Sequence, residues 1–408
     1  MASPADVDGL LAALAAPGAD ADAAEAHLAD LRRLVLSDGA DRNRLAKAPN
    51  AFQTLAAVLG APPASPAVQA RGIQVLSVAL QDAEVAGPAA ASGIVPPVAA
   101  AMAAFPAEQE VQSFGVAVLH NLAVAGKVPA AEVATTEGAL AALVKALETL
   151  PENTAIQTQG CKALSIMSEE SEMIQATIRD VGAIQAVLHT MDMFENSAPL
   201  QQTGIEFLRN MSRKSDKAQL LIGELSGIEA ICKAMSIFGS EEGLLTAGCA
   251  AFRFLAFNRD NRTKIGDAGG ITAIVEALKT LQSVPQRVES VFKAMNNATY
   301  DNIGNKTAAG RCGGIQVVIE VMERYRNLPE LQEDGCRLLR NLADGVELNR
   351  RIIADVGGIN AVLFAMTTHP NHVGISEHGC ATLLTLCKND ALLQYIRAAD
   401  VTRLVESR

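Results

Sequence analysis

The segment GCRLLRNLA, residues 335–343, contains the features that decide the fold. Its leucines cluster with Arg and Asn between them, a pattern that predicts a helix. The segment nevertheless begins with Gly335, a poor helix former. It also places Arg340 and Asn341 side by side in an otherwise apolar run. One copy explains neither feature, but the same arrangement recurs along the chain.

Two sets of positions repeat with the same period. Members of the first set precede an apolar helix and lie 43–45 residues apart: Gly93, Gly138, Gly182, Gly227, Gly270, Gly314 and Gly358, with a degenerate copy at Asn50. Members of the second set lie within helices like the one quoted, again 43–45 residues apart: Gly72, Gly115, Gly160, Gly204, Gly248, Gly335 and Gly379, with Val291 in register. A period near 44 residues is typical of helical solenoids of the armadillo or HEAT type.

Each repeat is predicted to contain three helices. A short helix 1 carries segments such as NRRIIADV, residues 349–356; helix 2 follows the first set of glycines, and helix 3 contains the second set. The glycine before helix 2 suits a sharp turn where a side chain would clash. The glycine in helix 3 is predicted to let the backbones of neighbouring repeats approach closely. Two-helix HEAT units are the alternative, and the short third helix and the recurrent Gly-Ile pair argue against them.

The sequence resembles the armadillo-repeat family. The segment LQEDGCRLLRNLADGVELNRRIIADVGGINAVLFAM, residues 331–366, is close to that family's consensus repeat, and the match covers almost the whole chain. The resemblance implies an all-α fold: a right-handed α-α superhelix, an armadillo-repeat solenoid of about nine three-helix repeats. Residues 1–49 are then a degenerate N-terminal repeat or cap, residues 50–398 the solenoid, and residues 399–408 a truncated C-terminal repeat or cap.

Composition narrows the classes of function. The net charge of −11 argues against a wholesale nucleic-acid binder. The chain has no run of about 18 apolar residues and no basic start, so we expect neither a membrane span nor a secretory signal. Seven scattered cysteines imply no disulfide framework and fit a reducing compartment. We expect a cytoplasmic protein, with nuclear or cytoskeletal association as further options.

Positions in helix 3 can be counted from its glycine. Offsets four and seven are apolar, for example Leu339 and Leu342, and predict the face that packs into the core. Cysteines recur at offset one and are predicted to fill the core as small apolar residues, rather than to bind metal or react. They are Cys161, Cys249, Cys336 and Cys380.

Asparagine recurs at offset six, well round helix 3 from the core positions. In the armadillo family helix 3 lines a concave groove, where this asparagine clamps the backbone of an extended partner peptide. The resemblance assigns that role to Asn121, Asn210, Asn297 and Asn341. An amide offers both a donor and an acceptor to a peptide unit; capping or solvation of the helix is the alternative. The series is interrupted by Ile166, Phe254 and Thr385. The chain also lacks tryptophan, which the family's nuclear-import adaptors stack beside the asparagine.

Basic side chains gather at groove offsets of helix 3 in four consecutive repeats. They are Arg209, Arg213, Arg253, Lys293, Arg337 and Arg340. Together with the asparagines they predict a groove for an extended, acidic or phosphorylated segment of a protein or peptide partner, held by arginine forks and amide clamps. Glu206 and Asp344 lie nearby, so the row is not purely basic. The alternative is that the arginine stems cover apolar helix surface while their heads are solvated.

No motif predicts catalysis or a cofactor. A metal site is suggested by His369, His372, His378 and Cys380, which lie within twelve residues. The repeat, however, places them partly in a loop and partly in the core, and their spacing matches no standard zinc pattern. The sequence GDAGG at residue 266 lacks the lysine of a phosphate-binding loop. We predict a non-enzymatic scaffold or adaptor without metal. The alternatives are a structural or chaperone-like subunit of a larger assembly that uses convex or end faces and, less favoured, a nuclear-transport adaptor.

Overall fold

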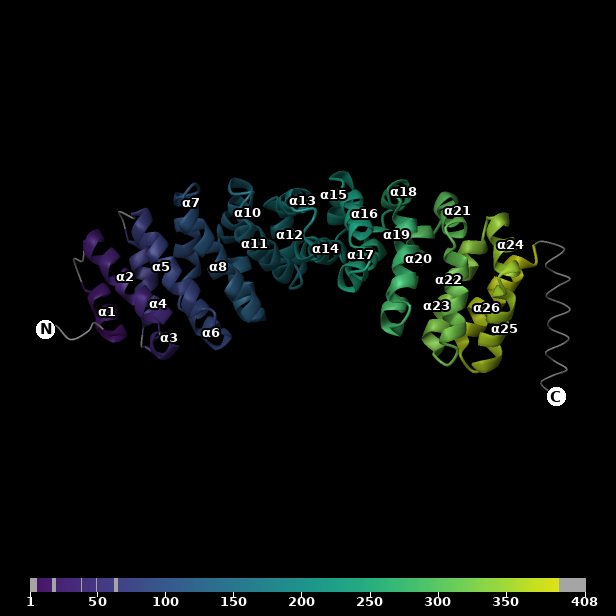
Figure 1. Cartoon of the computed structure of the whole chain (residues 1–408), viewed down its shortest axis with the longest axis horizontal. Coiled ribbons are helices and arrows are strands. Elements are labelled where there is room, and N and C mark those ends of the chain that lie inside the picture. The colour runs from purple at the N-terminus through teal and green to yellow at the C-terminus, as the bar shows by residue number, and fades with distance from the viewer. Residues whose placement is uncertain (1–5, 17–19, 38, 49, 62–64, 389–408) are drawn as a thin grey trace. The chain divides into compact units, whose positions relative to one another are not determined.

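The computed structural model describes residues 6–388 except 17–19, 38, 49 and 62–64. In this part the chain forms 26 helices and no strand, which confirms the all-α prediction (Figure 1). Contacts divide the chain into two compact units, Met1–Phe194 and Glu195–Arg408. The domain boundaries after residues 49 and 398 stay a prediction, and the second of them lies outside the described residues.

The first unit contains helices α1–α13. They are α1 (Val7–Leu14), α2 (Ala21–Ser37), α3 (Gly39–Lys47), α4 (Ala51–Gly60), α5 (Pro66–Ala79), α6 (Ala83–Ala91), α7 (Val95–Ala104), α8 (Gln109–Ala125), α9 (Lys127–Thr135), α10 (Ala139–Thr149), α11 (Thr154–Met167), α12 (Glu172–Asp180) and α13 (Ala183–Met193).

The second unit contains helices α14–α26. They are α14 (Ala198–Ser212), α15 (Asp216–Glu224), α16 (Gly227–Ile237), α17 (Glu242–Leu255), α18 (Arg259–Asp267), α19 (Gly270–Leu281), α20 (Pro285–Thr299), α21 (Ile303–Arg311), α22 (Gly314–Arg324), α23 (Pro329–Ala343), α24 (Glu347–Asp355), α25 (Gly358–Thr368) and α26 (Val373–Leu386).

The helices follow one order along the chain. From α3 to α26 they form triplets that begin with a nine-residue helix 1, followed by helix 2 and helix 3. Before them, α1 and α2 occupy the segments expected for a helix 2 and a helix 3. The three-helix repeat is therefore confirmed, and the two-helix alternative is wrong.

The turn into helix 2 uses one residue in the left-handed conformation. Where a single glycine stands there, the prediction is correct: Gly138 has φ +80°. In other repeats the preceding residue, a glycine or serine, takes this conformation and the glycine begins the helix. The positions predicted at Gly227, Gly270, Gly314 and Gly358 are therefore wrong by one residue. These second glycines provide space instead, since a Cβ on Gly270 would lie 2.8 Å from the carbonyl oxygen of Ile265.

The glycine in helix 3 makes room for a side chain of its own repeat. A Cβ on Gly335 would lie 2.6 Å from Met322 Cγ, and one on Gly115 would lie 2.5 Å from Met102 Sδ. Each methionine is on helix 2, thirteen residues earlier. The same pairs are Gly72 with Leu59, Gly160 with Leu147, Gly248 with Met235, and Gly379 with Met366. The predicted backbone approach between neighbouring repeats is wrong, because the close contact is between helix 2 and helix 3 of one repeat.

The core lies where the helix-3 offsets predict it. Leu339 and Leu342 have no exposed surface, and Cys249 is buried beside the equivalent positions of its repeat. Burial raises the pKa of the thiols of Cys161, Cys249 and Cys336 to about 12. Cys380 was predicted to be buried as well but is exposed, since α26 is the last helix 3 of the series in the described part.

The buried cysteines are expected to resist alkylation in the folded protein. With a pKa of about 12, roughly one thiol in 10,000 is ionised at pH 8, and burial also blocks the reagent. Treatment with iodoacetamide at pH 8 and peptide mass spectrometry should show modification of exposed Cys380 first. Cys249 should react only after denaturant is added. Equal labelling of both thiols in native buffer would contradict the core assignment.

A buried asparagine on helix 1 joins consecutive repeats of the second unit. Asn349 Nδ2 on α24 donates to the carbonyl oxygens of Lys306 on α21 and Leu342 on α23, both at 2.8 Å. Gly310 on α21 makes room for this side chain, because an added Cβ would lie 2.0 Å from Asn349 Oδ1. The same pairing occurs between Asn305 and Gly266 and between Asn261 and Gly223. We call these three asparagines and their glycines the helix-1 ladder.

A buried glutamine near the start of helix 3 caps helix 2 of the same repeat. Gln157 Nε2 donates to the carbonyl oxygens of Leu147 at 2.8 Å and Leu150 at 3.1 Å, and its Oε1 accepts a hydrogen bond from Thr190. These carbonyls lie at the C-terminal end of α10, where the helix has no further N–H groups to offer them. Equivalent caps are made by Gln69, Gln112 and Gln332.

Candidate functional site

The helix-3 asparagines bond to the helix 3 of the preceding repeat. Asn297 Nδ2 on α20 donates to the carbonyl oxygen of Arg253 on α17 at 2.9 Å. Asn341 Nδ2 on α23 donates to the carbonyl oxygen of Asn296 at 3.0 Å and to Thr299 Oγ1 at 2.8 Å. Sequence reasoning missed this role. Because the bonds use the amide nitrogens of Asn297 and Asn341, the amide oxygens of these two residues are the groups best placed to meet a partner. The peptide-clamp role itself stays a prediction.

The remaining two asparagines differ in setting. Asn121 lies on α8 of the first unit, where Nδ2 donates to the carbonyl oxygen of Ser77 at 3.0 Å. Asn210 lies on α14 of the second unit and is only 5% exposed. Its Oδ1 accepts hydrogen bonds from Arg209 Nε at 3.1 Å and Nη2 at 2.9 Å. Nine of the ten predicted groove residues therefore belong to the second unit, and Asn121 does not.

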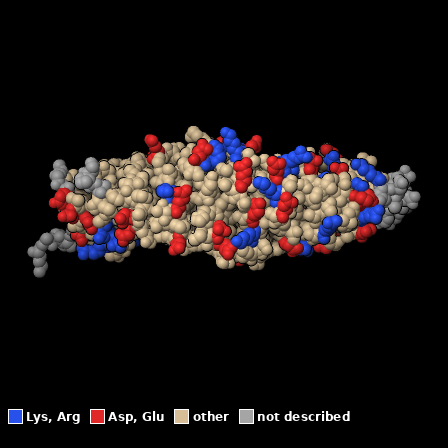
Figure 2. All heavy atoms as spheres, turned by 90° about the horizontal axis from the view of Figure 1, so that it is seen from above, with Lys and Arg blue, Asp and Glu red and all other residues tan. Residues whose placement is uncertain are grey.

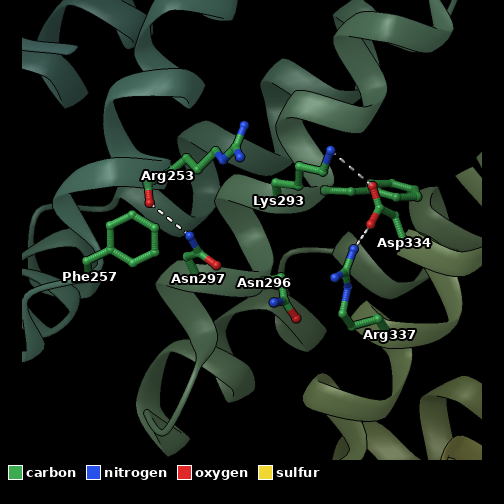
Figure 3. A pocket seen from close by; sticks show the side chains of 8 residues that line it. Arg253, Phe257, Lys293, Asn296, Asn297, Asp334 and Arg337 are labelled. Atoms are coloured by element: carbon green, nitrogen blue, oxygen red, sulfur yellow. Dashed lines mark hydrogen bonds and ion pairs between the residues drawn. The ribbon is translucent and has the colours of Figure 1, made fainter. Parts of the chain in front are cut away.

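The third helices of three successive repeats in the second unit, α17, α20 and α23, line a half-open pocket of about 210 Å³ (Figure 3). Its lining is Arg253, Phe257, Phe292, Lys293, Asn296, Asn297, Asp334 and Arg337. Four of these were predicted from the sequence: Arg253, Lys293, Asn297 and Arg337. We call this cavity the helix-3 pocket, and we call the exposed side of α14, α17, α20 and α23 that carries the predicted basic residues the helix-3 face.

Asp334 is the acidic group of the pocket, and sequence reasoning missed it. The residue is 6% exposed and lies between two cations, 3.9 Å from Lys293 Nζ and in an ion pair with Arg337 (Figure 3). Lys293 also pairs with Glu289, one turn earlier on α20. The predicted row of cations is thus partly neutralised from within, because acids one turn away on the same helices reach the same groups.

Arg253 and Arg340 keep their charge unpaired. Within the described part of the chain, neither forms an ion pair, and the Arg253 guanidinium instead lies 5.3 Å from the centroid of the Phe254 ring. Asp344, which follows α23, pairs with Lys306 and Lys388, at 3.6 and 3.9 Å. Three cations and one carboxylate line the helix-3 pocket, so its net charge is positive although the chain is acidic.

Charges of both signs are interspersed on one face of the molecule (Figure 2). Figure 2 shows one face of the molecule, where acidic and basic side chains alternate in small groups. A polyanion that binds through one broad basic field is therefore not favoured by this face, whereas a ligand that meets a few fixed cations is.

Two of the three clustered histidines, His372 and His378, lie near the same carboxylate, that of Glu333. His372 Nδ1 lies 3.8 Å from Glu333 Oε2, and His378 Nε2 lies 3.9 Å from Glu333 Oε1. Burial, with Arg337 nearby, lowers the pKa of His378. His369 lies apart, with Nε2 2.9 Å from the carbonyl oxygen of Arg326. Among the described residues, no group of three acidic, histidine or cysteine side chains is arranged to hold a metal ion.

The helices are short relative to the thickness of a membrane. In the described part no single helix is both long and apolar enough to span one, and two bent pairs, α6 with α7 and α24 with α25, reach the required length and composition only when joined.

Comparison with known proteins places the chain among helical repeats. The sequence model of the LRRK2 ARM repeat family matches residues 130–227 and 218–406, more than half of the chain. An engineered protein of known crystal structure has a TM-score of 0.74 at 18% identity, with 98% of this chain and 94% of that chain covered. A structure from work on a phosphorylation switch that controls the interaction between cadherin and β-catenin also has a TM-score of 0.74, at 14% identity, with 94% and 73% covered. At these identities the likeness shows the fold alone. No curated protein matches the sequence.

Proposed function

Because the chain belongs to the LRRK2 ARM repeat family, we propose that it is a non-enzymatic scaffold that binds an extended, acidic segment of a partner protein on the helix-3 face of its second unit. One observation carries this proposal: the helix-3 pocket is lined by the third helices of three successive repeats and has a net positive charge in an acidic chain. A partner segment that reaches from Arg253 on α17 to Arg340 on α23 passes three successive repeats and is therefore elongated, and carboxylates complement the charge it meets.

Two kinds of group are available to such a segment. Arg253 and Arg340 can each take a carboxylate by a bidentate contact without first breaking an ion pair in the described part of the chain. Asn297 and Asn341 keep an amide oxygen for a backbone N–H of the segment. Charge pairing would then select acidic sequences, and the amides would hold the chain without reading its side chains.

Reversal of the two unpaired charges is expected to weaken binding at least tenfold. Peptides selected from a random dodecapeptide phage library provide the ligands, and fluorescence anisotropy provides their dissociation constants. For Arg253→Glu with Arg340→Glu, a tenfold loss corresponds to about 1.4 kcal/mol. Affinity for the unaltered protein should also fall as salt rises from low to physiological concentration, because exposed charges are then screened beyond about 8–10 Å.

The matched control applies the same charge change on helix 1. Arg259 and Arg311 are exposed on α18 and α21 and do not line the helix-3 pocket. Arg259→Glu with Arg311→Glu should leave the affinity unchanged, and both double variants should keep the melting temperature of the parent. Normal binding by the Arg253 and Arg340 variant would mean that the ligand uses another face, such as the hollow of about 700 Å³ lined by α16 and α19. The assembly-subunit function would then be favoured.

A further inference from the structure

An aromatic residue interrupts the asparagine series next to the helix-3 pocket. Phe254 on α17 occupies offset six, the position of Asn297 and Asn341 in later repeats. Its ring is tilted by 52° against that of Phe257, with centroids 6.3 Å apart. The Arg253 guanidinium lies over the Phe254 ring, 5.3 Å from its centroid. Where later repeats carry an amide, this repeat therefore carries a cluster of two aromatic rings, Phe254 and Phe257, and the cation Arg253.

Phe257 is the member of this cluster that is exposed toward the pocket. It is 58% exposed and forms part of the pocket wall, beside Asn297 in Figure 3. Phe292, only 1% exposed, also lines the pocket and extends the apolar surface inward. A single exposed phenylalanine is ordinary in a folded protein. Here it lines, together with Phe292, a half-open pocket whose other six lining residues are polar or charged. Exposed aromatic surface next to fixed charges is a common arrangement for an anchor site at an interface.

The size of the pocket limits what it can hold. Small-molecule sites usually enclose about 300–1,000 Å³, and the helix-3 pocket encloses about 210 Å³. It is therefore suited to one large side chain rather than to a cofactor. Aromatic rings pack well against phenylalanine in tilted or offset geometry, and such pairs are stabilised beyond the area that they bury.

We propose that the helix-3 pocket receives an aromatic side chain of the partner segment, and that carboxylates near it in the sequence pair with Arg253 and Arg340. The inference rests on the proposed function and adds the identity of the anchor. Adjacent packed helices lie 8–10 Å apart, and three residues of polyproline II chain advance about 9 Å and return to the same face. The segment should then carry an acid about three residues from the aromatic.

The test uses the same dodecapeptide library, selected on the unaltered protein. Peptides should be enriched in an aromatic residue with an acid about three positions away. Phe257→Ala should weaken binding of a selected peptide at least tenfold, and replacement of the peptide's aromatic by alanine should weaken it equally. Both changes together should cost no more than either alone, because each removes the same contact. Phe257 is exposed, so its replacement should leave the far-UV circular dichroism unchanged.

Tyr300 provides the matched control. It occupies the same offset of α20 as Phe257 does in α17, is 62% exposed and does not line the pocket. Tyr300→Ala should leave the affinity unchanged; an equal loss would overturn the anchor. Enrichment of acids without an aromatic would also overturn the anchor while leaving the proposed function intact. Peptides that show no acidic preference and ignore the Arg253 and Arg340 variant would overturn both.

Discussion

Replacing Gly310 with alanine is expected to lower the melting temperature of the protein by about 10 °C. The new Cβ would lie 2.0 Å from Asn349 Oδ1, and Asn349 is fully buried. To make room, the amide must leave the carbonyl oxygens of Lys306 and Leu342. The loss of two buried hydrogen bonds costs about 2–4 kcal/mol, and each kcal/mol corresponds to about 2–4 °C for a unit of this size.

Gly304→Ala is the control for this prediction. Gly304 lies on the same helix α21, is exposed, and an added Cβ would approach only Asn302 Oδ1, at 3.4 Å. Alanine there should be neutral or stabilising by up to about 1 kcal/mol, because it is the better helix former. Thermal melts followed by circular dichroism compare the two variants directly. Equal melting temperatures would show that the helix-1 ladder contributes nothing. The double variant with Asn349→Ala should cost less than the sum of its parts, since it removes the clash.

Gln157→Leu is expected to destabilise the first unit by about 1–3 kcal/mol. The substitution keeps the bulk of the side chain but removes the glutamine partner of the Leu147 carbonyl oxygen. The Leu150 carbonyl oxygen still accepts from the Asn153 N–H at 3.2 Å, and the Thr190 hydroxyl still donates to the Ala186 carbonyl oxygen at 3.1 Å. Each buried polar group that loses its partner costs about 1–3 kcal/mol. Hydrogen exchange measured by mass spectrometry should show faster exchange at the end of α10 and in α11, where the cap is lost.

Gln159→Leu makes the same chemical change two residues along the same helix. Gln159 is half-buried, whereas Gln157 is 1% exposed. This variant should exchange like the parent protein and melt within about 2 °C of it. If Gln157→Leu behaved in the same way, the glutamine cap would be an incidental contact rather than a determinant of helix 2.

The repeat and its core could be predicted from the sequence because both depend on periodicity. Helix-3 positions such as Leu339 and Leu342 recur at a constant offset, and burial follows from that pattern alone. The identity of the residues that meet where two helices pack is not encoded in this periodicity. The partner of Gly335 is Met322, which stands on another helix, and only the packing of helix 2 against helix 3 shows that they meet.

The candidate site was predictable in composition but not in pairing. Arg253 and Lys293 both lie at predicted groove offsets. In the described part of the chain, however, Arg253 has no ion pair, whereas Lys293 pairs with Asp334 and Glu289. The sequence also indicated where Phe254 breaks the asparagine series. It gave no sign that a second ring, Phe257, lies beside the first, because that position, three residues later, holds no constant residue type: it is Val124, Glu169 and Tyr300 in other repeats.

The helix-1 ladder also sets a rule for how such chains change length during evolution. Asn349 and Asn305 each reach a carbonyl 43 residues earlier, and Asn261 reaches one 42 residues earlier. Excision of residues 268–311, one whole period that runs from the end of α18 to the end of α21, would bring Asn349 to the carbonyl of Arg262, which Asn305 uses now, with Gly266 already shaped to receive it. A deletion within these helices that is not a whole number of periods would bring the amide against the wrong face of the preceding helix. Recombination can therefore add or remove complete repeats, while small insertions are confined to the loops between helices.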